Sequence, residues 1–310
     1  MSDQKSALGI RVSGGGTREM TDWYLKSETG PLRDVLLGPA ESFDWLGPEN
    51  ADYSSLVRDS LRKGYSFDRD LALRQHAEMV EAYEDAGVTC HFLPLDHSTC
   101  MQVYARDSSF MTPYGAVICQ LANPRRRGEY AAALRFYIEN EVPIYDMVSA
   151  GSFEGGDFNI IKPGVALIGY TDHRSESVAA KQVADWFIAE GWEIKFAPID
   201  SFYVHIDLMV CMLSEHCAAV CLETTEDDIV DWLKSMNIEI IPATFEETMA
   251  LGCNVVALGN DKVLSTLGAK DLNAKMRAVG FTVYDPDMTQ FTRAGGGVHC
   301  MCQPLRRDPA

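Results

Sequence analysis

The chain has 310 residues, about twice the length of a typical domain, so it allows two domains or one large one. Hydrophobic residues make up 46% and charged residues 23%, which excludes a disordered chain and supplies enough apolar material for a full core. No run approaches the roughly 18 apolar residues of a membrane span, and residues 1–16 lack the apolar stretch of a secretory signal. We therefore expect a cytoplasmic protein with no membrane partner.

Acidic residues outnumber basic ones by 45 to 27, giving a formal net charge of −18. Because phosphate neutralisation requires a basic face, this balance argues against nucleic acid as a partner. It suits a small cationic substrate, although many acidic enzymes handle anions.

The chain contains nine cysteines, an odd number in a long chain without an export signal. Most of them lie in apolar runs and are expected to be small buried side chains rather than disulfide partners. Cys300 and Cys302 differ, because they follow a glycine run and stand beside His299.

An internal repeat predicts the fold class. Two short apolar runs, a helix-like segment and a third apolar run recur along the chain. Four such units begin near residues 108, 158, 204 and 254, and the first and last segments, 33–95 and 295–305, complete a fifth. Apolar residues at three- and four-residue spacing predict helices over residues 70–86, 129–140, 177–190, 226–236 and 270–278.

Polar residues occupy equivalent points of these units. Asp107, Asp157 and Asp207 are each 50 residues apart, and Asn254 and Cys300 follow after 47 and 46 residues. Each lies beside the start of its unit's first strand, so a cyclic arrangement would point all five toward one axis. The alternative is that Asp and Asn merely mark strand ends. Because five residues occupy equivalent positions of the repeat, we favour a funnel lined by carboxylates and one cysteine.

Cys300 and His205 are the candidate reactive residues. The three glycines from Gly295 allow a ligand to approach the backbone closely, and a thiol there is a nucleophile if a nearby cation favours the thiolate. Cys300 is alternatively a buried residue of the last strand. A zinc site is disfavoured, because Cys-x-Cys with one adjacent His lacks a second ligand pair, and no metal is expected. His205 is a candidate acid/base or a structural histidine, with Asp207 expected on the same strand face.

Carboxylates and arginines complete the candidate site. Glu154 and Asp157 flank a glycine pair, and together with Asp107 they match a planar cation, since a guanidinium donates in-plane hydrogen bonds to carboxylates. Arginines stand in the segments Arg126-Arg127-Gly128-Glu129 and His173-Arg174-Ser175, where they hold a substrate carboxylate or are surface charges.

The ordered motifs RD (106–107), EGGD (154–157), H-x-D (205–207) and GGGVHCMCQPLRR (295–307) resemble those of the guanidino-group modifying superfamily. This group includes dimethylarginine dimethylaminohydrolases, arginine deiminases and amidinotransferases, and the resemblance runs from about residue 32 to residue 307. It implies the pentein fold, a five-fold pseudosymmetric α/β propeller of ββαβ units. We expect one catalytic domain over residues 1–310, with an N-terminal extension over residues 1–30.

The resemblance also implies roles for single residues. Cys300 matches the nucleophile and His205 the general acid/base, while Glu154 and Asp107 match the acids that grasp the guanidinium, with Asp207 close by. Asp157 is expected among these substrate-binding carboxylates. The arginines associated with binding of the substrate carboxylate correspond to Arg126, Arg127 and Arg174. Cys302 departs from the family, which often has Thr or Ser at this position.

The expected activity is hydrolysis of a C–N bond at the guanidinium carbon of a dimethylarginine- or arginine-like substrate, through a covalent thiouronium on Cys300 and without a cofactor. An amidinotransferase and a non-catalytic binding protein of the same fold are the alternatives. The chain is short for an arginine deiminase and somewhat short for an amidinotransferase. Residues 41–67, with Phe43, Trp45 and Tyr53, form a lid or a structural cover. A homodimer is an expectation from the family alone.

Overall fold

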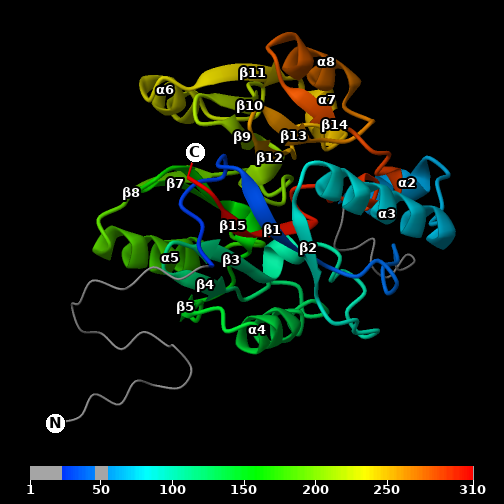
Figure 1. Cartoon of the computed structure of the whole chain (residues 1–310), viewed down its shortest axis with the longest axis horizontal. Helices are drawn as coiled ribbons and strands as arrows, with labels where there is room; N and C mark the ends of the chain where they lie inside the picture. Colours follow the sequence, from blue (N-terminus) through cyan, green and yellow to red (C-terminus); the bar gives the residue numbers. More distant parts are fainter. Residues whose placement is uncertain (1–22, 46–54, 310) are drawn as a thin grey trace.

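Five small sheets surround a common centre in the computed structural model, which describes residues 23–45 and 55–309 (Figure 1). Each sheet has three strands, of which the first two are antiparallel and the last two parallel. A helix connects the parallel strands of every sheet. This repeated ββαβ unit confirms the predicted propeller.

Four of the sheets are continuous in sequence. Their strands are β3 (Ser109–Thr112), β4 (Gly115–Ile118) and β5 (Ile144–Met147); β6 (Phe158–Lys162), β7 (Val165–Tyr170) and β8 (Glu193–Pro198); β9 (Val210–Ser214), β10 (Cys217–Cys221) and β11 (Glu239–Ala243); β12 (Val256–Gly259), β13 (Lys262–Leu264) and β14 (Thr282–Tyr284). Each of these sheets buries its first two strands almost completely, which explains their continuous apolar runs.

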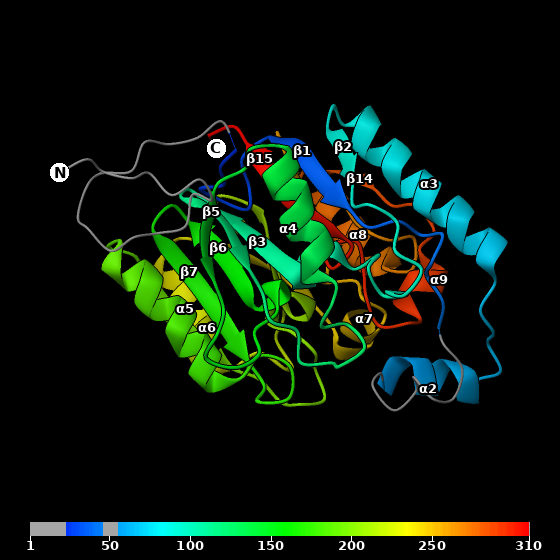
Figure 2. The ribbon, with the colours of Figure 1, turned by 90° about the horizontal axis from the view of Figure 1, so that it is seen from below.

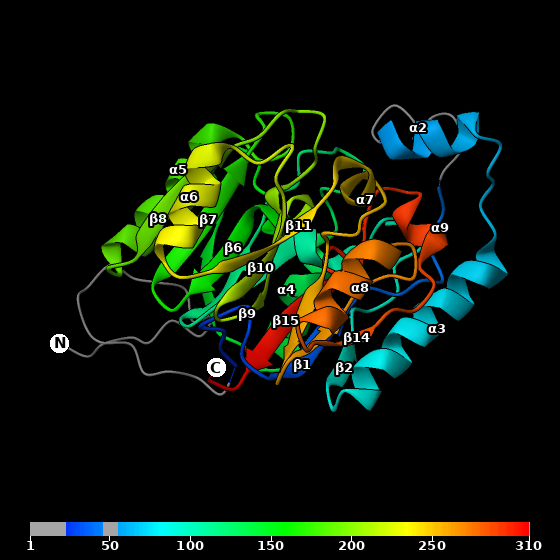
Figure 3. The ribbon, with the colours of Figure 1, turned by 90° about the horizontal axis from the view of Figure 1, so that it is seen from above.

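The fifth sheet joins the two ends of the chain and closes the ring. Strand β15 (Cys302–Arg307) pairs antiparallel with β1 (Leu32–Leu37), which pairs parallel with β2 (Thr89–Phe92). Figure 3 shows β15 and β1, in red and blue, side by side. The predicted sharing of one unit by the first and last segments is therefore correct.

The five predicted helices are present within one residue of their expected ends. They are α3 (Arg69–Asp85), α4 (Tyr130–Glu139), α5 (Ser177–Ala189), α6 (Asp227–Ser235) and α8 (Lys270–Ala278). Figure 1 shows α4 below the ring of sheets, and Figure 2 shows α3 and α5 at opposite edges of the molecule. In α3 the carboxylate of Asp68 accepts the N–H of Leu71 as an N-cap, and Gly87 follows the helix with a φ of 87°.

Three short helices were not predicted from the sequence. They are α2 (Ser55–Arg62), α7 (Phe245–Met249) and α9 (Thr289–Thr292). Helix α2 falls within the predicted lid or cover, in which Phe43 and Trp45 are buried. The Trp45 indole donates a hydrogen bond to the carbonyl of Gln290 at 2.6 Å. Tyr53 and the rest of residues 46–54, like residues 1–22 of the N-terminal extension, lie outside the described residues.

Two predicted strands begin later than expected. The run from residue 204 enters a 3-10 turn, η3 (Ile206–Leu208), and its strand starts at Val210, because the carboxylate of Asp157 takes the N–H of Ile206 at 2.9 Å. His205 and Asp207 therefore do not share a strand face, which corrects the sequence-based prediction. The last strand starts at Cys302 rather than near residue 295.

Among the described residues, no helix combines the length and apolar character that a membrane crossing needs. The cytoplasmic location and the homodimer stay predictions.

Because β15 closes the ring, we expect the effect of a substitution in this strand on stability to depend on whether the side chain is buried. Leu305 is fully buried in β15, whereas the neighbouring Arg306 is exposed and pairs with Asp34 at 2.7 Å. We expect Leu305→Ala to lower the free energy of unfolding by about 2–5 kcal/mol and Arg306→Ala to lower it by less than about 1 kcal/mol. Urea denaturation followed by circular dichroism measures both. Equal effects of the two substitutions would contradict this role of β15.

Candidate active site

The five in-phase polar residues lie at the centre of the propeller, one to three residues before the first strand of each sheet. They are Asp107, Asp157, Asp207, Asn254 and Cys300. Three of them stand in 3-10 turns that precede their strands, namely η1 (Ala105–Ser108), η2 (Gly155–Asp157) and η3. Since the segments belong to different sheets, residues about 50 positions apart become neighbours.

Glycines allow the turns to pack closely around the axis. A Cβ on Gly155 would clash with the carbonyl oxygen of Arg106, and one on Gly156 would lie 2.6 Å from Nδ1 of His205. The EGGD motif is therefore explained by close approach of its backbone to the RD and H-x-D segments, as well as by its acids.

Asn254 holds the loop that carries the nucleophile candidate. Its Oδ1 accepts the N–H groups of His299 at 3.0 Å and of Cys300 at 3.1 Å, and its Nδ2 donates to the carbonyl of Asp207 at 3.1 Å. The N–H of Arg106 donates to the carbonyl of Cys300 at 3.1 Å. These bonds occupy the backbone groups before β15, which is why the strand cannot begin earlier.

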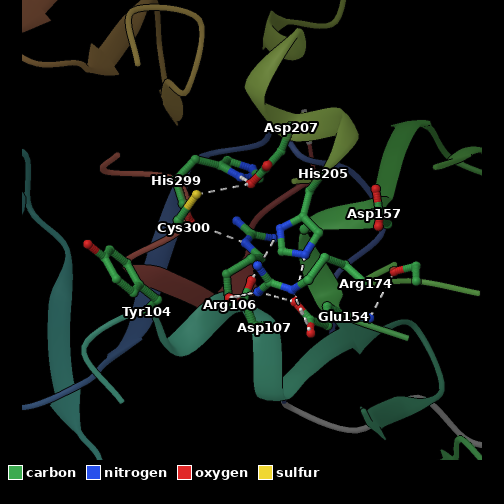
Figure 4. A network of polar contacts seen from close by, with 12 residues as sticks. Tyr104, Arg106, Asp107, Glu154, Asp157, Arg174, His205, Asp207, His299 and Cys300 are labelled. Atoms are coloured by element: carbon green, nitrogen blue, oxygen red, sulfur yellow. Dashed lines mark hydrogen bonds and ion pairs between the residues drawn. The ribbon is translucent and has the colours of Figure 1, made fainter. Parts of the chain in front are cut away.

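A cavity of about 70 Å³ opens onto these segments. It is lined on its polar side by Asp107, Arg126, Arg174, His205 and Cys300. Figure 4 shows the side chains of Cys300 and His205 on opposite sides of the cluster, with Arg174 and Glu154 below the imidazole. Trp45, Met101 and Leu208 contribute an apolar wall, so the cavity suits a ligand with a polar head and an aliphatic chain.

Cys300 is 5% exposed, and its Sγ lies 3.7 Å from Oδ2 of Asp207. Burial raises the pKa of the thiol well above its ordinary value, and the charges of Asp207 and Asp107 raise it further. The protein alone therefore favours the thiol. A cation placed between Cys300 and these carboxylates would shift the balance toward the reactive thiolate.

His205 is buried between carboxylates. Its Nε2 lies 2.8 Å from Oε2 of Glu154, and its Nδ1 lies 3.6 Å from Oδ1 of Asp107. Burial alone would lower the pKa of the imidazole, but Asp107, Asp157 and Glu154 together raise it to about 9. His205 is therefore a cation at neutral pH and can donate a proton.

Glu154 has no exposed surface, and each of its oxygens meets two donors. Oε1 accepts the N–H of Ala122 at 3.1 Å and Nε of Arg174 at 3.1 Å, while Oε2 accepts from the Arg174 guanidinium at 2.5 Å and from His205. Burial acts to raise its pKa, but Arg174 and His205 hold it well below the usual range. Glu154 is thus an ionised anchor for two cations.

The three predicted arginines have different surroundings. Arg126 is buried and binds Oδ2 of Asp107 at 2.6 Å and Glu129 at 2.8 Å. Arg127 is exposed, and its guanidinium donates to the carbonyl of Ala122 rather than lining the cavity. Arg174 lines the cavity, and 22% of its side chain is exposed.

Of the four predicted acids, Asp107 lines the cavity, whereas Glu154 contacts His205 and Asp207 contacts Cys300 behind it. Asp157 contacts the backbone of a neighbouring turn instead. Its Oδ1 accepts the N–H of Ile206, and burial raises its pKa to about 6. This geometry connects η2 to η3 and thereby places His205.

Sequence reasoning placed Asn254 at the axis without giving it a role, and it missed His299 and Arg125 as parts of the site. Asn254 binds the loop that carries Cys300, His299 contacts Asp207, and Arg125 lines the cavity. The phase of Asn254 in the repeat and the position of His299 beside Cys300 were the available signals.

Asp107, Glu154 and His205 form the closest group of possible metal donors among the described residues, with one donor atom of each within 4.8 Å of the others. Both carboxylates carry an arginine, and the imidazole holds a proton where a metal would need its lone pair. The donor set fits guanidinium partners better than a metal ion.

Comparison with known proteins agrees with this geometry. The family described as N,N dimethylarginine dimethylhydrolase, eukaryotic, matches residues 47–307. The chain belongs to this family. It is thus a member of the guanidino-group modifying superfamily and of a family of guanidino-group hydrolases, which confirms the resemblance seen in the sequence motifs.

Individual relatives of the family are distant. The chain is 25% identical over 285 residues to the uncharacterized protein YkgA of Bacillus subtilis, a match that covers 91% of this chain and 94% of the relative. It superposes with a TM-score of 0.72 on dimethylarginine dimethylaminohydrolase from Pseudomonas aeruginosa, which was solved as a cysteine-to-serine mutant with citrulline. The two chains are 20% identical, and the match covers 88% of this chain and 99% of the other. The amidinotransferase SxtG from Microseira wollei gives a TM-score of 0.77 at 15% identity, covering 94% of this chain and 98% of the other.

The charge state of His205 can be measured directly. We expect Glu154→Gln to lower the pKa of His205 from about 9 toward its ordinary value of 6.5, because a neighbouring negative charge is lost. NMR titration of the histidine Cε1 protons provides the measurement. Glu129→Gln is the matched control, since Glu129 is equally buried but binds Arg126 instead. A His205 pKa that stays at about 9 in Glu154→Gln would contradict this assignment.

Proposed function

We propose that the protein hydrolyses a C–N bond at the carbon of a guanidinium group, with Cys300 as nucleophile and His205 as general acid and base. One observation carries the proposal: a thiol and a protonated imidazole lie at one cavity together with buried carboxylates. A guanidinium carbon is a weak electrophile, because resonance spreads its charge, and a thiolate is an intrinsically strong nucleophile.

Unpartnered carboxylate oxygens near Cys300 support a substrate with N–H donors. Among the described residues, four buried carboxylate oxygens have no hydrogen-bond partner, and they include Oδ1 of Asp107 and Oδ1 of Asp207. Asp107 lines the cavity, and Asp207 lies beside the Cys300 thiol. A bound guanidinium would satisfy such oxygens, which are costly to leave unpaired. Because Glu154 is filled by Arg174 and His205, we assign it to holding His205 rather than to direct contact with the guanidinium.

The first chemical step uses the charge of the substrate. Binding of the guanidinium beside Cys300 opposes the negative charges that raise the thiol pKa, so the thiol proton is released to solvent. The thiolate Sγ forms a bond to the guanidinium carbon. His205 then donates its proton to the departing nitrogen, the C–N bond breaks, and a thiouronium remains on Cys300.

The second step regenerates the enzyme. Neutral His205 takes a proton from water, whose oxygen attacks the thiouronium carbon. The C–S bond breaks, the thiolate leaves, the remaining hydroxyl proton passes to solvent, and a neutral ureido product forms. Asp107 and Glu154, which together favour protonated His205, oppose premature loss of its proton.

The surroundings of the cavity restrict the part of the substrate beyond the guanidinium. Arg174 is the one of the three predicted arginines that lines the cavity with an accessible side chain, so we assign it to binding of a substrate carboxylate. Arg126 is held by Asp107 and Glu129, and Arg127 lies outside the cavity. A dimethylarginine- or arginine-like substrate fits this arrangement.

Amidino transfer to an amine is the second candidate function, favoured by the fold likeness to the amidinotransferase SxtG. Both functions share the thiouronium and differ in what attacks it. Incubation with arginine, methylated arginines, agmatine and guanidinobutyrate, with and without an amine acceptor, distinguishes them. Hydrolysis gives a ureido product without an acceptor, whereas transfer gives a new guanidino compound. A pure binding protein would give neither.

The role of the nucleophile has a matched control in the same loop. We expect Cys300→Ser to lower kcat by at least about 10³-fold, because a hydroxyl is a weaker nucleophile, and Cys302→Ser to retain most of the activity. Ureido product formation is measured after chelator treatment, which should have no effect. Full activity of Cys300→Ser, or loss of activity on chelation that a metal restores, would refute the mechanism.

A further inference from the structure

An imidazole with no assigned role lies beside the nucleophile. His299 Nδ1 is 2.8 Å from Oδ2 of Asp207, and both side chains are at most 5% exposed. His299 comes from the loop before β15 and Asp207 from η3, so the pair bridges two sheets of the propeller (Figure 4). The same Oδ2 lies 3.7 Å from Sγ of Cys300.

The pair fixes the position of one proton. Burial acts to raise the pKa of Asp207, but the hydrogen bond and charge of His299, with smaller effects of His205 and Arg106, lower it overall, so Asp207 is an ionised acceptor. His299 Nδ1 must then donate. Burial and the charge of Arg106 lower the pKa of His299, which is therefore neutral, with its single proton on Nδ1.

The backbone of His299 prevents the ring from moving away. Its N–H is bound by Oδ1 of Asn254 at 3.0 Å, and its carbonyl accepts Nε of Arg106 at 3.4 Å. The imidazole therefore presents Nδ1 to Asp207 from a fixed position. With Oδ2 of Asp207 engaged by His299 and by the thiol, Oδ1 is the oxygen that is left without a hydrogen-bond partner within the described part of the chain.

We propose that His299 is a positioning residue, whose Nδ1–H keeps Asp207 ionised and turned so that Oδ1 can accept an N–H of the guanidino substrate next to Cys300. This proposal rests on the proposed function. In this role His299 contributes to the specificity of the site for a cationic guanidinium group. If Asp207 were neutral or turned away, the site would lose one charged acceptor.

Other charged groups around the pair do not replace this donor. Arg106 and Glu28 face His299 from the RD turn and the N-terminal segment, and they lie 3.6 Å from one another. His205 acts on Asp207 by charge alone, because its Nε2 is bound to Glu154. No other side chain among the described residues donates a hydrogen bond of N–H or O–H type to the Asp207 carboxylate.

The test compares His299→Asn with His299→Gln. The Nδ2 of Asn can occupy the place of imidazole Nδ1, whereas the amide nitrogen of Gln extends to the place of Nε2. Gln keeps more of the volume of His. If His299 acts only by packing, His299→Gln should be the more active variant, whereas if it acts by its hydrogen bond to Asp207, His299→Asn should be. We expect His299→Asn to retain kcat/KM within about threefold and His299→Gln to lose roughly 10- to 100-fold, mainly through KM, as for the loss of a hydrogen bond to a charged group. Equal losses, or a better His299→Gln, would overturn the proposal.

The pH dependence gives a second signature. Without the donor, burial raises the pKa of Asp207, so protonation removes its charge at a higher pH. The acid limb of kcat/KM should move to higher pH in His299→Gln and stay in place in His299→Asn. An unchanged acid limb in His299→Gln would contradict the role of Nδ1–H.

A measurement without substrate separates this proposal from the proposed function. The chain has seven histidines, and ¹⁵N NMR of the histidine-labelled protein distinguishes their tautomers. We expect one of them, absent from the spectrum of His299→Asn, to titrate below the ordinary value of 6.5 and to carry its single proton on Nδ1 at neutral pH. A His299 protonated on Nε2, or titrating near 6.5, overturns the positioning role. Activity of Cys300→Ser would instead refute the proposed function and leave this tautomer in place.

Discussion

Burial of negative charge at the propeller axis is the constraint on which the site depends. Asp107, Glu154 and Asp207 are almost inaccessible to water, and an unpaired buried ion costs several kcal/mol. For Asp107 and Glu154 the protein offsets that cost with three cations, each within hydrogen-bond or ion-pair distance of a carboxylate, whereas Asp207 is bound by His299. The three cations are Arg126 on Asp107, Arg174 on Glu154, and protonated His205 between Asp107 and Glu154. Burial and the charges of Asp207 and Asp107 keep Cys300 a thiol, while Asp107, Asp157 and Glu154 keep His205 charged. The charge of Asp107 therefore stabilises the protonated form of both the proposed acid and the proposed nucleophile.

Closure of the ring makes this concentration of charge feasible. Each sheet contributes one strand start to the axis, and hydrogen bonds between adjacent starts hold them in place, as when Asn254 binds the backbone of His299 and Cys300. The last of these starts belongs to β15, which is held by β1 from the other end of the chain. The position of Cys300, the proposed nucleophile, thus depends on pairing between residues more than 260 positions apart.

Much of this arrangement could be predicted from the sequence. Apolar runs and helical spacing gave the helices within one residue, and the 46- to 50-residue phase brought Asp107, Asp207 and Cys300 to one axis. The phase of a repeat fixes how far a residue lies from the axis, but not the direction of its side chain. Asp157 consequently shares the phase and yet turns away from the cavity to bind the backbone of Ile206.

Contacts between sheets determine the remaining features, and local sequence does not contain them. Arg126 and Arg127 are adjacent and chemically identical, but only Arg126 reaches Asp107. The turn at residues 206–208 replaces the start of a predicted strand, because an acid from the neighbouring sheet accepts a backbone N–H. The sequence shows only that His299 stands beside Cys300, whereas its contact with Asp207 follows from the packing of two sheets.

The central claim is that burial and the neighbouring carboxylates keep Cys300 protonated until a cation binds. Absorbance of the thiolate at 240 nm, taken as the difference between the wild type and Cys300→Ser, gives the pKa of this thiol. Titration is done in the protein alone, with ethylguanidinium, and with neutral ethylurea of similar shape. We expect a pKa above the ordinary value of 9.0 in the protein alone, a clear decrease with ethylguanidinium, and no change with ethylurea. A thiol pKa below about 7 in the protein alone, or the same shift with ethylurea, would contradict the claim.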